Sequence, residues 1–147
     1  MGNAKTIILK GHGIRKERMA VAAITPGHLV EITSADKVQV HATAGGLAQK
    51  GFAVEDDLQG NPISTAYVAG YAVQYNIMKP GEEVNALIAN GEDIAIGDKL
   101  VSAGDGTLKE LTSESTDESV VAIAVEACDM SGSSAADPSG RCAVEVI

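Results

Sequence analysis

Residues 94–109 read IAIGDKLVSAGDGTLK, which is two short apolar runs separated by glycine-containing turns. Gly97 interrupts the first run, and Gly104, Asp105 and Gly106 interrupt the second. An Asp-Gly pair supplies the positive φ that a tight hairpin turn needs, and apolar residues on both sides favour strands. The stretch therefore predicts a β-hairpin whose turns depend on these residues.

A related pattern occurs earlier in the chain, where residues 24–30 read ITPGHLV. Aligning Gly27 with Gly97 places Val30 opposite Leu100, so both stretches follow the pattern Ile-x-x-Gly-x-x-apolar. Two copies are fewer than the three that repeat architectures normally need. We interpret the likeness as one local solution, a glycine turn between two strands, which the chain uses twice.

The composition favours an all-β chain with a core of small side chains. Of 147 residues, 45% are hydrophobic but only 3% are aromatic, so Val, Ile, Leu and Ala must fill the core. The 16 glycines are spread along the chain, which favours many short strands joined by turns. No apolar run approaches the roughly 20 residues of a membrane span, and no signal-peptide pattern is present, so we expect no membrane partner.

The net charge of −9 is unevenly distributed. Residues 1–18 carry five basic side chains against Glu17 alone, whereas residues 19–147 are strongly acidic. We therefore divide the chain into a basic N-terminal arm, residues 1–18, and a β-rich domain, residues 19–147. The acidic body lacks the positive charge that displaces counterions from a phosphate backbone, so we expect no nucleic-acid partner.

The arm contains a β-prone run followed by a basic segment, and the two together form a candidate binding element. A β-prone run followed by glycines can add to the edge of a partner's sheet, and the basic residues suit an acidic surface. The alternatives are an ordinary first strand of the chain's own sheet and a merely solvated terminus. The candidate binding residues are Thr6, Ile7, Ile8, Leu9, Lys10, Arg15, Lys16 and Arg18.

Alternating apolar residues predict strands in the rest of the chain. Residues 29–32 and 38–41 read as a hairpin in which His41 faces solvent, and residues 82–91 read as a strand that ends in a turn. The nearly all-apolar residues 120–125 predict a strand buried on both faces, and residues 142–147 alternate as a final strand. We expect loops over residues 111–119 and 129–141.

Three tyrosines, Tyr67, Tyr71 and Tyr75, share a stretch that fits either a strand or one face of a helix. Gly70 and the β-favouring Tyr and Val content favour the strand. On one side of a strand the tyrosines would form a contact patch, because Tyr is enriched at interfaces. The alternative is that they fill the core of a chain otherwise short of aromatic residues.

The sequence contains no recognisable catalytic or metal-binding pattern. The three histidines have no patterned partners, and there is no phosphate-binding loop, no nucleophile motif and no zinc spacing. We therefore expect no catalytic residues, no cofactor and no metal. Cys128 and Cys142 each lie where a strand meets a loop, and reduced thiols are favoured over a disulfide for a protein assembled in a cytosol.

The turns and strands described above resemble those of the head decoration (capsid cement) proteins of tailed bacteriophages. The resemblance rests on residues 84–87, 90–91, 94–102, 104–109, 121–127 and 143–146. It implies a small β-tulip or β-barrel-like domain that binds the outer surface of the expanded capsid and stabilises contacts between major capsid protein subunits. It also implies a virion protein that is assembled in the host cytoplasm and is not an enzyme.

The resemblance further implies self-association on the shell, with a trimer favoured over a dimer, and an arm that orders on the capsid. Two other functions stay open. The chain is alternatively another phage structural component, such as a head-fibre base or a tail part. The second alternative belongs to a different class of protein and is a small ligand-binding or sugar-binding β-module.

Overall fold

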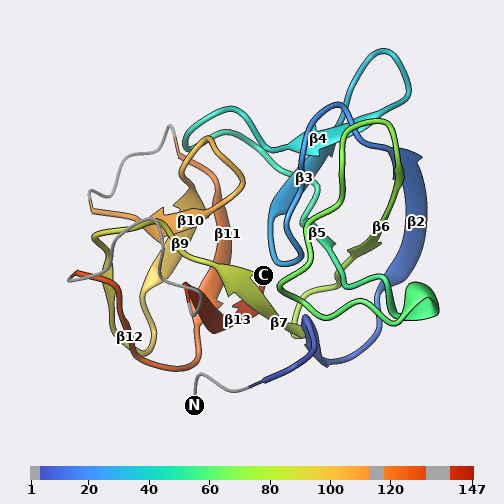
Figure 1. The fold of residues 1–147 in the computed structure, drawn as a ribbon. Coiled ribbons are helices and arrows are strands. Elements are labelled where there is room, and N and C mark those ends of the chain that lie inside the picture. Colours follow the sequence, from blue (N-terminus) through green and yellow to red (C-terminus); the bar gives the residue numbers. More distant parts are fainter. Residues whose placement is uncertain (1–3, 113–117, 132–139) are drawn as a thin grey trace.

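The computed structural model describes residues 4–112, 118–131 and 140–147, and the regular secondary structure of these residues consists almost entirely of β-strands (Figure 1). One turn of 3₁₀ helix, η1 (Asp57–Gln59), is the only helical element among them. The predicted all-β class is confirmed, but none of the sheets closes into a barrel.

The first large sheet has six antiparallel strands and contains most of the second half of the chain. The buried strands β13 and β11 lie in its middle, as expected for the apolar residues that compose them. In order across the sheet, the strands are β1 (Ile8–Lys10), β7 (Glu83–Leu87), β13 (Arg141–Val146), β11 (Val120–Ala124), β9 (Lys99–Ser102) and β10 (Leu108–Glu110).

The second large sheet has five antiparallel strands and lies beside the first, on the right of Figure 1. Its two edges approach each other at one end, where Ala20 forms a parallel bridge with Val38. In order, its strands are β2 (Ile14–Met19), β6 (Ala72–Ile77), β5 (Gly51–Ala53), β3 (Leu29–Ile32) and β4 (Val38–Val40). A short ladder of β8 (Asp93–Ile94) and β12 (Cys128–Asp129) completes the fold.

The two sheets have separate hydrophobic clusters that meet at β3. Leu29 packs into the larger cluster with residues of the six-stranded sheet, such as Leu100 and Val144. The next residue, Val30, packs into the smaller cluster with Val73. Successive strand residues point to opposite faces, so one strand serves both cores and fixes the sheets against each other.

One type of turn recurs at the start of strands. Among the described residues, six turns have an i to i+3 backbone hydrogen bond and a glycine at the third position with positive φ, which is the requirement of a type II turn. Five of them precede β3, β6, β7, β8 and β9, and the sixth lies between β4 and β5. Their glycines are Gly27 (φ +100°), Gly45 (φ +68°), Gly70 (φ +85°), Gly81 (φ +94°), Gly91 (φ +88°) and Gly97 (φ +90°). The likeness between residues 24–30 and 94–101 is therefore structural, and the chain uses the turn more often than the sequence pattern indicated.

The predicted hairpins are confirmed. Strands β9 and β10 pair with Ser102 opposite Leu108, and the turn between them contains Gly104 and Gly106 at positive φ. Gly106 also joins the two sheets, because its N–H donates to the carbonyl of His41 and its carbonyl accepts from the N–H of Leu29 at 2.8 Å. A Cβ at Gly106 would lie 2.8 Å from the Cβ of Val40, so only glycine fits this junction. The hairpin of β3 and β4 forms with Ile32 opposite Val38.

The N-terminal segment departs from the expected free arm. Strand β1 pairs with β7 and strand β2 pairs with β6, so residues 8–10 and 14–19 belong to the chain's own sheets. Ile7 is fully buried, because an apolar run is more stable inside the core than in solvent. The chain therefore follows the alternative in which this segment supplies its own first strands, and residue 18 is no structural boundary.

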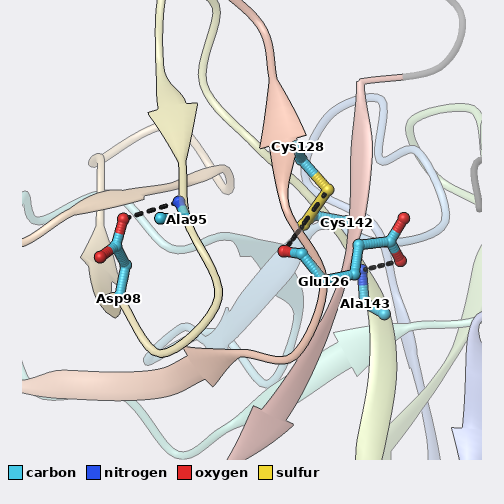
Figure 2. Close-up of a disulfide and its surroundings, with 6 residues drawn as sticks. All are labelled: Ala95, Asp98, Glu126, Cys128, Cys142 and Ala143. Atoms are coloured by element: carbon cyan, nitrogen blue, oxygen red, sulfur yellow. Dashed lines mark hydrogen bonds between the residues drawn. A yellow bond between two sulfur atoms is a disulfide. The ribbon is translucent and has the colours of Figure 1, made fainter.

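Two further expectations are wrong. His41 does not face solvent but is 3% exposed, with Nδ1 2.7 Å from the Ser102 hydroxyl and Nε2 3.1 Å from the carbonyl of Leu47. Strand β4 ends at Val40, so the strand alternation that placed His41 outside does not reach it. Cys128 and Cys142 are not free thiols but form a disulfide between β12 and β13, beside Glu126 (Figure 2). Topology brings them together in a way that their spacing alone does not reveal.

The two predicted loops lie partly outside the described residues. Residues 113–117 of the first and residues 132–139 of the second are not described. Within the first, residues 111 and 112 are in no strand, which agrees with the expectation.

Candidate functional site

The described residues offer little catalytic chemistry. They contain no group of three or more His, Cys, Asp or Glu side chains that would hold a metal ion. His28 and Asp105 border one cavity of about 220 Å³, but both are engaged in the fold. His28 Nδ1 accepts a hydrogen bond from the N–H of Thr25, and Asp105 accepts from the N–H of Thr107 in the hairpin turn. Burial lowers the pKa of His28, which favours the neutral ring in this role.

A larger cavity of about 810 Å³ lies on the outer side of the five-stranded sheet. It is bounded by β2, by β6, by η1 and by the chain that joins η1 to β6. Its lining mixes carboxylates, amides, hydroxyls and exposed apolar side chains. The lining residues are Glu17, Asp56, Leu58, Gln59, Asn61, Thr65, Ala66, Tyr67, Val68, Tyr71, Ala72 and Gln74. This volume falls within the range of about 300–1,000 Å³ that is typical of small-molecule sites.

Pairing between β2 and β6 fixes the floor of the cavity. Glu17 lies directly opposite Gln74, so both side chains point to the same face of the sheet. Two contacts hold the rim of the cavity in place. Arg15 of β2 forms an ion pair with Asp57 of η1 at 3.8 Å, and the Tyr67 hydroxyl donates to the carbonyl of Val54 at 2.6 Å. Burial raises the pKa of Tyr67 to about 12, so this hydroxyl stays protonated and keeps its bond.

The predicted tyrosine patch is divided between the core and the surface. Tyr67 and Tyr75 are buried in the smaller hydrophobic cluster, whereas Tyr71 is 68% exposed. Strand β6 begins only at Ala72, and the turn before it breaks the alternation that would have placed all three on one side. Core filling is thus the role of two tyrosines, and only Tyr71 is available for contact.

The predicted basic residues are also divided. Lys10 lies in the six-stranded sheet and pairs with Glu83 at 3.6 Å. Arg15, Lys16 and Arg18 lie on β2, beside the strand that carries Tyr75. Arg18 donates hydrogen bonds to Asp36 at 2.9 Å and to the Tyr75 hydroxyl at 2.5 Å.

The sheet therefore brings the second half of the basic segment next to the tyrosine segment. It places Ile7, Ile8 and Leu9 elsewhere, beside β7, while the exposed Thr6 precedes this pairing.

Sequence reasoning missed most of the cavity's lining. Leu58, Gln59 and Asn61 lie in a stretch that reads as irregular loop, and nothing in their types indicates a site. Gln74 carried a usable signal, because it alternates with Val73 and Tyr75 along a predicted strand. That alternation assigns it to the face opposite the buried pair.

The fold resembles one known from a bacteriophage. The chain is similar to the structure described as the crystal structure of head fiber gp8.5 N base in bacteriophage phi29, with a TM-score of 0.59 and 17% sequence identity. The match covers 91% of this chain and 93% of that chain, so the likeness extends over the whole fold. Comparison with protein-family models and with curated proteins finds no match. None of the described helical residues forms a helix long and apolar enough to cross a membrane.

Proposed function

We propose that this chain is a non-enzymatic structural component of a bacteriophage virion that binds the outside of the head. The observation that carries the proposal is the fold likeness to a phage head fibre base over nearly the full length of both chains. The turn and strand pattern, which resembles that of capsid decoration proteins, supports the same class of function independently. Each is a likeness of architecture, so the attachment itself needs a direct test.

Two roles within this class are distinguished by what binding does to the head. As a decoration protein, the chain clamps neighbouring major capsid protein subunits and raises the stability of the expanded shell. As the base of a head fibre, it anchors at the shell without stabilising it. The name of the structural neighbour favours the second role, and the turn pattern favours the first.

The open edge of β2 is the proposed attachment element. Ala20 donates to the carbonyl of Tyr71 and accepts from the N–H of Gly70, so its backbone faces β6. Val21, one residue further, donates to Val38 on the other side. Backbone groups alternate in direction along an antiparallel strand, so those of Arg15, Glu17 and Met19 face the open edge. An extended segment of the major capsid protein can add there as a further strand.

The basic residues of β2 attract an acidic partner less strongly than the sequence alone suggested. Arg15 and Arg18 are already paired with Asp57 and Asp36, whereas Lys16 is exposed on β2. Attraction to an acidic shell is therefore modest, and salt should weaken it further. Useful affinity then needs several copies acting together, which supports a trimer, with a dimer as the alternative.

Cosedimentation with purified heads of the phage that encodes the chain tests the proposal. We expect binding to expanded heads and not to unexpanded heads, and the melting temperature of the decorated heads separates the two roles. Arg15→Pro removes one N–H from the open edge and should abolish binding, whereas Arg15→Ala removes the same ion pair and should retain it. Absence of binding to expanded heads by the unaltered chain would contradict the proposal.

A further inference from the structure

The cavity on the outer side of the five-stranded sheet has the chemistry of a carbohydrate site. We propose that it binds a neutral oligosaccharide that carries acetamido groups. This function is additional to head attachment, because the cavity opens on one face of β2 and β6 while the proposed attachment uses the backbone edge of β2. Three features of the cavity carry the inference.

The first feature is an unused hydrogen-bond acceptor at the cavity. Gln74 lines the cavity and is 6% exposed, and its Oε1, which is itself buried, has no hydrogen-bond partner among the described residues. Its Nε2 donates to Asp56 Oδ1 over a long 3.4 Å. A buried polar atom without a partner costs about 1–3 kcal/mol, so such atoms call for an explanation. A small adjustment of this amide would let Oε1 accept from a ligand's hydroxyl or amide N–H.

The second feature is a set of exposed apolar side chains around the polar floor. Tyr71 is 68% exposed, Leu58 is 78% exposed and Val68 is 62% exposed, and all three line the cavity. A tyrosine ring offers a flat face on which the C–H face of a sugar ring can stack. The two aliphatic side chains suit the methyl group of an acetamido substituent. A purely polar ligand would leave this surface unused.

The third feature is the charge and polarity of the lining. Glu17 and Asp56 contribute two carboxylates, and none of the described lining residues is basic. An anionic ligand such as a phosphate or an acidic sugar is therefore disfavoured. Carboxylates and amides together present acceptors and donors at fixed spacing, which matches neighbouring sugar hydroxyls. The amides of Gln59, Asn61 and Gln74 also match the donor and acceptor of an acetamido group.

The volume agrees with this class of ligand. About 810 Å³ exceeds what one sugar ring fills and suits a short oligosaccharide. The ion pair between Arg15 and Asp57 and the bond from Tyr67 to Val54 hold opposite parts of the rim without a ligand. The site is therefore largely formed in advance, which lowers the cost of ordering on binding.

Titration calorimetry of the full chain with triacetylchitotriose tests the inference. We expect saturable binding by triacetylchitotriose, weaker binding by maltotriose, which lacks acetamido groups, and none by sialyllactose, which is acidic. Absence of saturable binding of triacetylchitotriose below about 10 mM would overturn the proposal. Equal binding of maltotriose, or tighter binding of sialyllactose, would overturn the assigned ligand class.

Matched variants place the binding in this cavity. Tyr71→Ala removes an exposed side chain and should weaken binding roughly tenfold, as expected for the loss of one stacking interaction. Gln74→Met removes the unpaired acceptor at similar length, so binding should fall while the melting temperature stays equal or rises. Ile96→Ala, at a similarly exposed apolar residue in the turn between β8 and β9, is the control. Unchanged binding by Tyr71→Ala would overturn the assignment, whatever the outcome of the head-binding experiment.

Discussion

The carboxylate of Glu82 accepts a hydrogen bond from the backbone N–H of His12 at 3.0 Å, although 70 positions separate the two residues. The same carboxylate accepts from the N–H of Gly13 at 3.3 Å and from that of Lys79 at 2.6 Å. It therefore ties the connection between β1 and β2 to the turn before β7. Gly11 lies so close that a Cβ there would collide with the Glu82 side chain.

We predict that Glu82 makes the free energy of unfolding depend on pH in the acidic range. Its pKa is lowered, chiefly by the hydrogen bond from the Lys79 N–H, because the charged form accepts these bonds best. A carboxylate with a lowered folded pKa contributes stability above its unfolded pKa, and loses it as pH falls through the folded pKa. Urea unfolding from neutral pH to below the ordinary value of 4.5 should show this loss. In Glu82→Gln the neutral stability should fall and the acid dependence should shrink, while Glu17→Gln, at an exposed glutamate of β2, serves as the control.

We predict that residues 1–18 are needed for folding itself. Ile7 is fully buried and its carbonyl accepts from the N–H of Asn85 at 2.7 Å. Ile7→Ala should lower the free energy of unfolding by about 2–5 kcal/mol, as for other buried large-to-small changes. Deletion of residues 1–18 should prevent folding, measured by circular dichroism. Thr6→Ala, at an exposed neighbour, should have little effect. A deletion variant that melts like the full chain would show that both strands are dispensable.

We predict that reduction of the Cys128–Cys142 disulfide destabilises the protein without unfolding it. The bridge spans 14 positions, and closing a loop of that size stabilises by about 3 kcal/mol in the chain-entropy treatment. Chemical denaturation with and without a reductant measures the difference, and the Cys128→Ala, Cys142→Ala double variant should be insensitive to the reductant. Equal stability in both conditions would mean that the bridge constrains the unfolded chain little.

Local signals predicted the two hairpins and the central strands of the six-stranded sheet. They missed β2, which was assigned to a basic arm, and β5, which lies in a stretch that reads as irregular loop. They also left open how strands far apart in the sequence pair. The glycine turns before β3 and β9 and the hairpin at Gly104 to Gly106 depend on backbone φ, which residue type reveals directly. The position of β1 beside β7 depends on contacts between residues far apart, such as Ile8 and Val84. No periodicity encodes that choice, so a docked first strand and a free arm look alike in sequence.

The candidate site was less predictable than the fold for a related reason. Tyr71 belongs to the same apparent pattern as Tyr67 and Tyr75, yet a turn at the start of β6 exposes it alone. Cys128 lies on β12 of the two-stranded ladder, whereas Cys142 lies on β13 of the six-stranded sheet. The two cysteines meet only because this ladder and this sheet pack side by side. Such features depend on how separate strands and turns pack together, and the sequence of a single strand or turn does not reveal them.

We predict that the buried contact between His41 and Ser102 stabilises the junction of the two sheets. The Ser102 hydroxyl also accepts from the N–H of Gly104 at 3.1 Å, so it serves two partners. Ser102→Ala leaves His41 Nδ1 unpaired in a buried position and also removes the acceptor of the Gly104 N–H, so it should cost about 1–3 kcal/mol. Ser102→Thr keeps the hydroxyl but adds a methyl group to a fully buried position, so it tests packing separately. A loss in Ser102→Ala well below this range would mean that water replaces the hydroxyl.

We predict that two glycines with nearly the same φ differ sharply in their tolerance of alanine. At Gly97 (φ +90°) no atom of the described residues would lie within 4 Å of a new Cβ, so Gly97→Ala should cost about 1–2 kcal/mol from backbone strain alone. At Gly106 (φ +85°) the new Cβ would also collide with Val40. Gly106→Ala should therefore cost clearly more, and melting temperatures of the two variants measure the difference. Equal effects would show that the junction can relax around the methyl group.

The central place of β13 in its sheet has a consequence for synthesis on the ribosome. Residues 141–146 pair with β7 on one side and with β11 on the other, so both strands lack this neighbour until the last of these residues emerges. Nascent chains would meanwhile present two unpaired apolar edges to one another, which is the condition under which strands from different polypeptides associate. Yield of native protein should thus depend on how soon residues 141–146 leave the ribosome, and chaperones that cover exposed edges should matter most in that interval.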